Sequence, residues 1–269
     1  MHDKITTLSK RGFGLKQVFT IVLLAVVLGG LIFINRALAG RHFVVSGAPG
    51  ELIFAESFDQ PDNWGLYDDG QLSAEAVDGT LRMSVNAVNS GAFSSAAAHF
   101  GDLDLRVDAA AVDGPIDNAF GLIFGLQNQD NNRISDDSYF LFQISSDGYY
   151  RMTRTDSGQE RILSNWIQSE FVHSEIGAAN RLRVTAHNGL LQFYVNDQIM
   201  QLCIPDDPAG ISTYYPSLGC VDGQMFDGLE GSSYTGGRVG VVAQSTAAGG
   251  SGVTVDFNNL VVFVPKVAS

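Results

Sequence analysis

Aromatic, amide and cationic side chains alternate with apolar ones in two stretches of this sequence, residues 138–156 and 181–196. Aromatic rings stack on the apolar faces of sugar rings, and planar amide or guanidinium groups match pairs of hydroxyl groups. Gly121 and Gly125 are expected to leave room for close approach. We therefore predict a carbohydrate-binding surface made of Tyr139, Gln143, Tyr149, Arg151, Arg183, His187 and Tyr194. An ordinary outward sheet face, or a face that a loop covers, is the alternative.

Short alternating runs separated by turn residues must position these side chains. No long segment after Ile34 has a helical period, so the sequence predicts an all-β domain in which two antiparallel sheets pack through one face each. The expected strands are 52–58, 80–85, 103–112, 119–127, 139–145, 149–155, 181–187, 190–196, 238–244 and 253–262. In the strand 119–127, Phe120, Leu122, Phe124 and Leu126 are expected to share the core side.

The hairpin within residues 138–156 can be tested by its register. A two-residue turn would place Arg151 on the apolar face of Phe142, whereas a three-residue loop with Gly148 left-handed pairs Phe142 with Met152. The second register is expected, with Phe140, Phe142, Ile144, Tyr150 and Met152 in the core. Tyr139, Leu141, Gln143, Tyr149, Arg151 and Thr153 then form the opposite surface.

The N-terminal part of the chain differs from the rest. Residues 1–17 form a basic segment and residues 18–34 carry no charge, which is typical of a segment delivered to a membrane with its basic end in the cytoplasm. We predict a transmembrane anchor or signal-peptide core at 18–35, a linker at 36–50 and a β-sandwich domain at 51–265. Ala37–Ala39 would suit a signal peptidase, so the product is either a single-pass membrane protein with an extracytoplasmic domain or a secreted protein.

The charge of the domain agrees with export. Residues 42–269 carry 10 Lys/Arg and 28 Asp/Glu, a net charge of −18, and Lys266 is their only lysine. So acidic an exterior repels phosphate backbones, and we expect no nucleic-acid partner.

Cys203 and Cys220 both fall in the part predicted to be exported. In an oxidising compartment they are expected to form a disulfide, with two buried free thiols as the alternative. This disulfide would hold the one long irregular stretch expected in the domain, residues 205–236, whose tyrosines and acidic residues suit a sugar or a cation.

No pattern of catalytic residues or bound cofactor emerges. The five histidines lack zinc spacing, and there is no nucleophile elbow or phosphate-binding loop. Hard oxygen ligands at Asp130, Asn131, Asn132, Asp136 and Asp137 would suit a structural calcium ion, although an Asx-rich turn also explains them.

The order of several motifs along this chain is similar to that of a known protein superfamily. "LIFAESFDQPDNWGLYDDG", "DGTLRMSV", "FGLIFGLQNQDNN", "YFLFQISSDGYYRMTRTDSGQERIL", "NRLRVTAHNGLLQFYVND", "GRVGVVAQS" and "VTVDFNNLVVF" together resemble the concanavalin A-like lectin/glucanase superfamily, in particular its laminin G-like and 3-keto-disaccharide hydrolase-like exported bacterial domains. The resemblance spans about residues 52–263. It implies a jelly-roll sandwich whose concave face or rim loops often bind carbohydrate.

The same resemblance bears on catalysis. Hydrolases of the laminarinase type carry E-x-D-x-E or E-x-D-x-x-E on one strand, and neither pattern occurs here. We therefore expect a membrane-anchored, non-catalytic binding module with a glycan ligand. The alternatives are a structural ectodomain that contacts an envelope protein, and a hydrolase whose carboxylates come from separate strands.

Overall fold

The computed structural model describes residues 43–61, 63–127 and 137–266, which contain strands and no helix. Within those ranges no helix is long and apolar enough to cross a bilayer. The segments predicted at 1–17 and 18–35 lie outside the described residues, so the N-terminal helix stays a prediction. The part of the linker that is described contains a short strand, Val44–Val45.

One sheet, called sheet A here, has seven strands. Across the sheet they are β1 (Val44–Val45), β6 (Gly91–Phe100), β19 (Gly237–Ser245), β8 (Asn118–Gln127), β9 (Ser138–Ile144), β10 (Tyr149–Asp156) and β11 (Gln159–Gln168). Neighbouring strands are antiparallel except β1 and β6, which are parallel.

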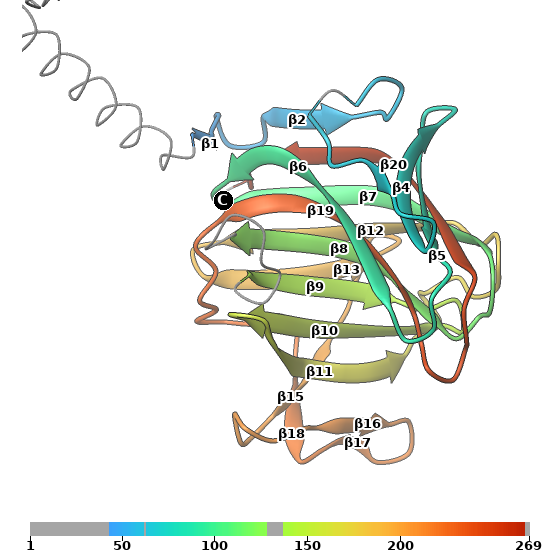
Figure 1. The fold of residues 1–269 in the computed structure, drawn as a ribbon. Helices are drawn as coiled ribbons and strands as arrows, with labels where there is room; N and C mark the ends of the chain where they lie inside the picture. The colour runs from blue at the N-terminus through green and yellow to red at the C-terminus, as the bar shows by residue number, and fades with distance from the viewer. Residues whose placement is uncertain (1–42, 62, 128–136, 267–269) are drawn as a thin grey trace, which may run out of the picture. The chain divides into compact units, whose positions relative to one another are not determined.

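The other sheet, sheet B, has nine strands. Across the sheet they are β14 (Gln198–Ile199), β13 (Leu190–Val195), β12 (Asn180–His187), β7 (Leu103–Asp113), β20 (Val253–Phe263), β5 (Thr80–Val85), β4 (Leu72–Val77) and β3 (Tyr67–Asp68), while β2 (Leu52–Glu56) also pairs with β20. In Figure 1, strands β8 and β9 of sheet A lie in front of β12 and β13 of sheet B. The fold is thus an all-β sandwich, as predicted.

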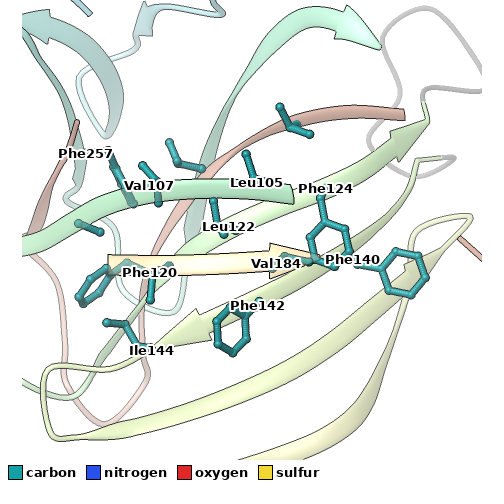
Figure 2. Packing of buried hydrophobic residues seen from close by; sticks show 14 of the residues in the cluster. Leu105, Val107, Phe120, Leu122, Phe124, Phe140, Phe142, Ile144, Val184 and Phe257 are labelled. Carbon is teal, nitrogen blue, oxygen red and sulfur yellow. The ribbon is translucent and has the colours of Figure 1, made fainter. Parts of the chain in front are cut away.

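The core lies between the two sheets. Successive side chains of a strand point to opposite faces of its sheet, so each sheet has one apolar face. The apolar faces of sheets A and B pack against each other, and burial of this surface drives their association. Figure 2 shows Leu105, Val107, Val184 and Phe257 of sheet B packed with the aromatic and aliphatic side chains of β8 and β9.

The hairpin β9–β10 has the predicted register. Ile144 pairs with Tyr150 and Phe142 with Met152, and Gly148 has a φ of 93°. All five residues predicted for the core on this hairpin are buried: Phe140, Phe142, Ile144, Tyr150 and Met152.

Strand β8 departs from simple alternation at Gly125. Phe124 pairs with Phe140 and Gln127 with Ser138, so β8 has one residue more than β9 in this interval. Gly125 has a φ of 62°, which glycine adopts without steric cost. This β-bulge turns Leu126 to the outer side of sheet A, and the prediction that it shares the core side with Phe124 is wrong.

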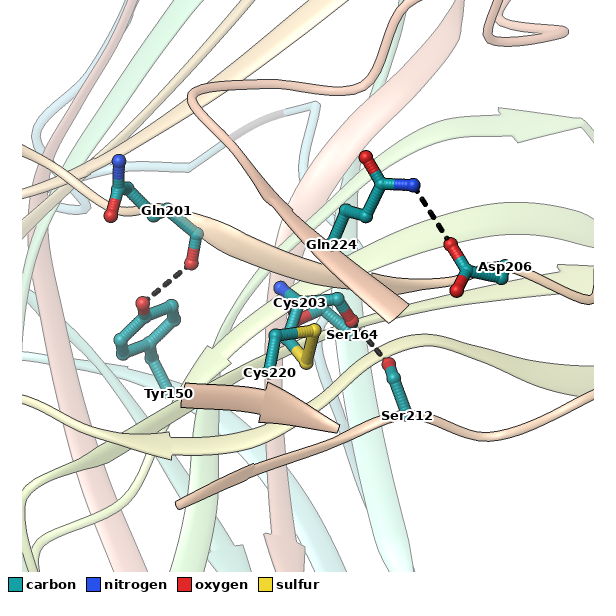
Figure 3. Close-up of a disulfide and its surroundings, with 8 residues drawn as sticks. All are labelled: Tyr150, Ser164, Gln201, Cys203, Asp206, Ser212, Cys220 and Gln224. Atoms are coloured by element: carbon teal, nitrogen blue, oxygen red, sulfur yellow. Dashed lines mark hydrogen bonds between the residues drawn. A yellow bond between two sulfur atoms is a disulfide. The ribbon is translucent and has the colours of Figure 1, made fainter. Parts of the chain in front are cut away.

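The stretch 205–236 is more regular than expected. It holds β16 (Thr213–Tyr215), β17 (Gly219–Val221) and β18 (Gly223–Phe226), and β18 pairs with β15 (Leu202–Pro205). A disulfide joins Cys203 of β15 to Cys220 of β17 with a Cα–Cα distance of 5.5 Å, as predicted. The backbone N–H of Cys203 donates to Ser164 Oγ on β11, and Tyr150 Oη donates to the carbonyl of Gln201 at 2.6 Å, which fastens this disulfide finger (residues 202–226) to sheet A (Figure 3).

Candidate functional site

The seven residues predicted for one binding surface lie on two different sheets. Tyr139, Gln143, Tyr149 and Arg151 belong to β9 and β10 of sheet A, whereas Arg183, His187 and Tyr194 belong to β12 and β13 of sheet B. In both sheets these residues alternate with core residues, so they point to the two outer faces of the sandwich. The single surface expected from the sequence is therefore wrong.

The outer face of sheet A is not open along β9 and β10. Leu141, Gln143 and Thr153 were expected on a surface, yet each is buried. Leu141 belongs to a second apolar cluster with Ile123, Leu126 and Val242, against which Phe93 and Tyr139 pack. The bulge at Gly125 supplies this cluster with Leu126, so aliphatic side chains fill this part of the face.

The polar groups of the same face bind one another. Arg151 donates from Nε to Gln143 Oε1 and from Nη2 to Gln244 Oε1, both at 3.0 Å, and Gln143 Nε2 donates to Gln244 Oε1 at 2.8 Å. The Arg151 guanidinium lies over the Trp166 ring, 4.7 Å from its centroid, and burial lowers the pKa of Arg151. This network takes up the amide of Gln143, which is fully buried, and two nitrogens of a guanidinium that is itself largely buried under Trp166.

Glycines of β8 do not leave room for a ligand. A Cβ at Gly121 would lie 2.2 Å from the carbonyl oxygen of Phe142, and one at Gly125 would lie 3.1 Å from the ring of Tyr234. The space expected at these glycines is occupied by the protein itself.

The outer face of sheet B contains a hollow of about 560 Å³, which we call the basic hollow. Its lining comes from β7, β12, β13, the end of β20, the residue Gly50 before β2 and the segment 264–266 after β20. The lining residues are Gly50, Asp104, Arg106, Arg183, Thr185, His187, Leu190, Gln192, Tyr194, Phe263, Val264, Pro265 and Lys266. The three predicted residues of sheet B are all among them.

Asp104 organises the floor of the basic hollow. Arg106 on the same strand and Arg183 on β12 each donate from Nε and Nη2 to its carboxylate, at 2.7–3.0 Å. Burial opposes ionisation of Asp104, but the two guanidinium groups outweigh it and hold the pKa of this carboxyl below its ordinary value. Asp104 is therefore an ionised acceptor whose function is to position the two arginines.

Aromatic rings support the same two arginines. The guanidinium of Arg183 lies 4.7 Å from the centroid of Tyr194, and that of Arg106 lies 4.9 Å from the centroid of Phe263. Each contact is a cation–π interaction that fixes the plane of the guanidinium. Tyr194, which is half-buried, thus lines the hollow and also holds Arg183 in place.

His187 is a further lining residue of the hollow. Its Nδ1 is 2.8 Å from Asp102 Oδ2 and its Nε2 is 2.8 Å from Asn188 Nδ2, so both ring nitrogens already have partners. Thr185 and Gln192, which pair across β12 and β13, complete the polar part of the lining, and Leu190 and Phe263 are apolar.

Several residues of the basic hollow were missed by sequence reasoning: Asp104, Arg106, Gln192, Phe263 and Lys266. Alternation in β7 does predict that Asp104 and Arg106 face outward. It carries no signal that β7 lies between β12 and β20, because that pairing joins residues far apart in the chain.

Two further hollows lie beside the basic hollow or on the same sheet. One of about 350 Å³ shares Leu190 and Gln192 with it and extends to Ile204 and Phe226. Another of about 610 Å³ is lined by polar residues around Asp108 and Arg181 on β7 and β12. The outer face of sheet B therefore offers a broad, uneven surface around the basic hollow.

The predicted calcium ligands fall largely outside the described residues. Residues 130–136 are among those not described, and Asp137 is buried. Within the described ranges, no group of three or more His, Cys, Asp or Glu residues could hold a metal ion.

Comparison with known proteins identifies the fold. No protein-family model matches the sequence, and no curated protein does. Among solved structures, a Bacillus subtilis protein described as having a galectin-like fold matches over 81% of this chain and 97% of its own, with a TM-score of 0.54 and 10% identity. The carbohydrate binding module CBM66 from Bacillus subtilis matches over 76% and 97%, with a TM-score of 0.50 and 12% identity.

A β-glucanase from Bacillus licheniformis also matches, over 82% of this chain and 100% of its own, with a TM-score of 0.51 and 8% identity. These likenesses confirm the concanavalin A-like fold that the order of motifs implied. At such low identity they show the fold alone, since one sandwich hosts many functions.

Proposed function

We propose that the chain is an extracytoplasmic binding module that holds carbohydrate in the basic hollow without changing it chemically. The observation that carries the proposal is the composition of this hollow: apolar walls stand beside fixed guanidinium, amide and hydroxyl groups in a space of about 560 Å³. Pockets that bind small ligands have this character, with a few oriented polar groups in an apolar setting. Neighbouring hollows leave room for a chain of sugars to continue.

The single carboxylate of the hollow favours binding over hydrolysis. A glycosidase needs two carboxyl groups, one of which is protonated to act as the acid. Among the residues that the structure describes, Asp104 is the one acidic residue that lines the hollow, and two guanidinium groups keep its pKa low. Such a carboxyl group is a poor proton donor near neutral pH.

The location of the module is part of the proposal. Segment 18–35 is proposed to anchor the chain in the cell membrane, or to be removed after Ala39, with the domain on the extracytoplasmic side. The Cys203–Cys220 disulfide supports an oxidising compartment.

A glycan array probed with the purified full chain tests the function, followed by calorimetry on the strongest binder. We expect Arg183→Gln to weaken binding at least tenfold, because it removes a fixed donor from the hollow. Arg161→Gln, an exposed arginine of β11 on the other sheet, is the matched control and should bind as the unmodified chain does. A blank array, together with a melting temperature that saturating sugars do not change, would contradict the proposal.

One observation favours a second candidate, a structural ectodomain that contacts another protein. The disulfide finger exposes four large apolar side chains, Ile211, Tyr215, Leu218 and Phe226, the last of which borders the hollow beside the basic one. A protein partner that co-purifies from solubilised membranes, and is lost in a Leu218→Ser, Phe226→Ser variant, would support this candidate. Purification of the chain alone would count against it.

A further inference from the structure

We infer that the basic hollow selects sugars that carry an oxyanion, either a carboxylate or a sulfate group, over their neutral counterparts. This inference rests on the proposed function and names the class of ligand that the same site takes.

The charge of the hollow is opposite to that of the domain. Residues 42–269 carry 28 acidic residues against 10 Lys/Arg, yet Arg106, Arg183 and Lys266 line the hollow with the single carboxylate of Asp104. Such a local excess of positive charge attracts an anion even though the protein as a whole repels it. An anion in the hollow is close to these cationic groups, whereas salt screens charges that are farther away than about one Debye length, roughly 10 Å at 0.1 M salt.

The arginines keep donors that are free to bind a ligand. Each guanidinium uses Nε and Nη2 on Asp104, and no described group accepts a hydrogen bond from Nη1 of either residue. One carboxylate therefore fixes two guanidinium groups and neutralises only one of them. Their side chains are 37% and 28% exposed, so a ligand can reach them. Guanidinium groups bind carboxylate and other oxyanions through parallel N–H donors.

Lys266 adds a third positive charge to the lining of the basic hollow. Its ammonium has no ion pair within the described part of the chain, and the side chain lies against Gly50, where a Cβ would be 3.1 Å from Lys266 Cε. A hydrogen bond of 2.9 Å from Gly50 N–H to the carbonyl of Val264 holds the two segments together. The only lysine of residues 42–269 thus lines the same hollow as two arginines that are already oriented.

A glycan array built from matched pairs tests the inference. Each pair presents the same backbone with free or methyl-esterified uronic acids, or with and without sulfate groups. We expect the anionic member to bind at least tenfold more tightly, with the difference shrinking at 0.5 M salt. A preference for the carboxylated or for the sulfated pairs would identify which oxyanion the site takes.

Calorimetry on the glycan pair with the largest difference in affinity tests whether Lys266 causes the preference for the anionic member. Lys266→Gln is expected to lower the affinity for the anionic member several-fold more than the affinity for the neutral member, and so to reduce the preference between them. Arg161→Gln, the control on sheet A, should leave both affinities unchanged. Equal affinity for both members of the pairs, or a preference that Lys266→Gln does not alter, would overturn the inference and leave the proposed function standing. An array on which no glycan binds would contradict the proposed function itself.

Discussion

Arg106 and Arg183 lie directly opposite each other on β7 and β12 and donate to the same carboxylate, that of Asp104. Like charges at opposite positions of neighbouring strands normally destabilise a sheet. Here the buried carboxylate between them compensates the repulsion and holds both guanidinium groups in place. The basic hollow therefore depends on one acidic residue.

Replacement of Asp104 by Asn should destabilise the domain by about 2 kcal/mol at neutral pH, because two guanidinium groups lose a charged hydrogen-bond acceptor. The pKa of Asp104 is lowered in the folded state, so its contribution is present above the ordinary pKa of an aspartate, about 4, and is lost as the pH falls through the lower folded value. Denaturant unfolding measured from pH 7 to pH 2 should show a smaller decline for Asp104→Asn than for the unmodified chain.

Asp113→Asn is the matched control, since Asp113 is an exposed residue at the end of the same strand. Its effect should stay within about 0.5 kcal/mol. If both variants lose the same stability, or if the pH dependence of Asp104→Asn equals that of the unmodified chain, the role assigned to Asp104 is wrong.

The two outer faces should differ in ligand binding. Tyr194→Ala removes the ring beneath Arg183 in the basic hollow, and we expect about a tenfold loss of glycan affinity, which corresponds to about 1.4 kcal/mol. Tyr149→Ala removes a half-buried tyrosine from the outer face of sheet A and should leave the affinity unchanged. Calorimetry measures the glycan affinity of both variants. A larger loss of affinity for Tyr149→Ala than for Tyr194→Ala would show that the binding site lies on sheet A.

The β-bulge can be tested with two glycines of positive φ. Gly189→Ala, in the β12–β13 turn with a φ of 79° and open space around it, should cost about 1 kcal/mol, the penalty of the left-handed conformation alone. Gly125→Ala meets the ring of Tyr234 as well and should cost about 2–3 kcal/mol. Equal losses in chemical denaturation would show that the packing at the bulge is looser than described.

The disulfide should stabilise the finger and the sheet edge beneath it. A Cys203→Ala, Cys220→Ala variant is expected to lose about 3 kcal/mol, the loop-closure contribution of a loop of this size. A reductant should lower the denaturation midpoint of the unmodified chain and leave that of the double variant unchanged. A midpoint that ignores reductant in both proteins would contradict the prediction.

Local patterns in the sequence predicted the strands with bulky alternation and the register of the β9–β10 hairpin. Strand β6 was missed, because "GAFSSAAAHF" is made mostly of small residues that produce no contrast between its two faces. The bulge at Gly125 was missed for a different reason, since a glycine inside an alternating run does not by itself reveal an extra residue.

The error in the candidate site also has a physical cause. Alternation tells which side chains of a strand point away from the core, but it does not tell to which of two sheets the strand belongs. Arg151 and Arg183 both point outward as predicted, from different sheets. Their separation follows from long-range pairing such as that of β12 with β7, for which a single sequence has no local signal.

Two segments near opposite ends of the β-sandwich meet at the basic hollow. Gly50, before the first strand of sheet B, and Lys266, after its last strand, both line the basic hollow. A purification tag or fluorescent protein fused close to either position would crowd the opening and weaken binding for reasons unrelated to the sequence of the hollow. The same geometry offers an advantage, because a small dye attached near position 266 would sense the arrival of a ligand directly.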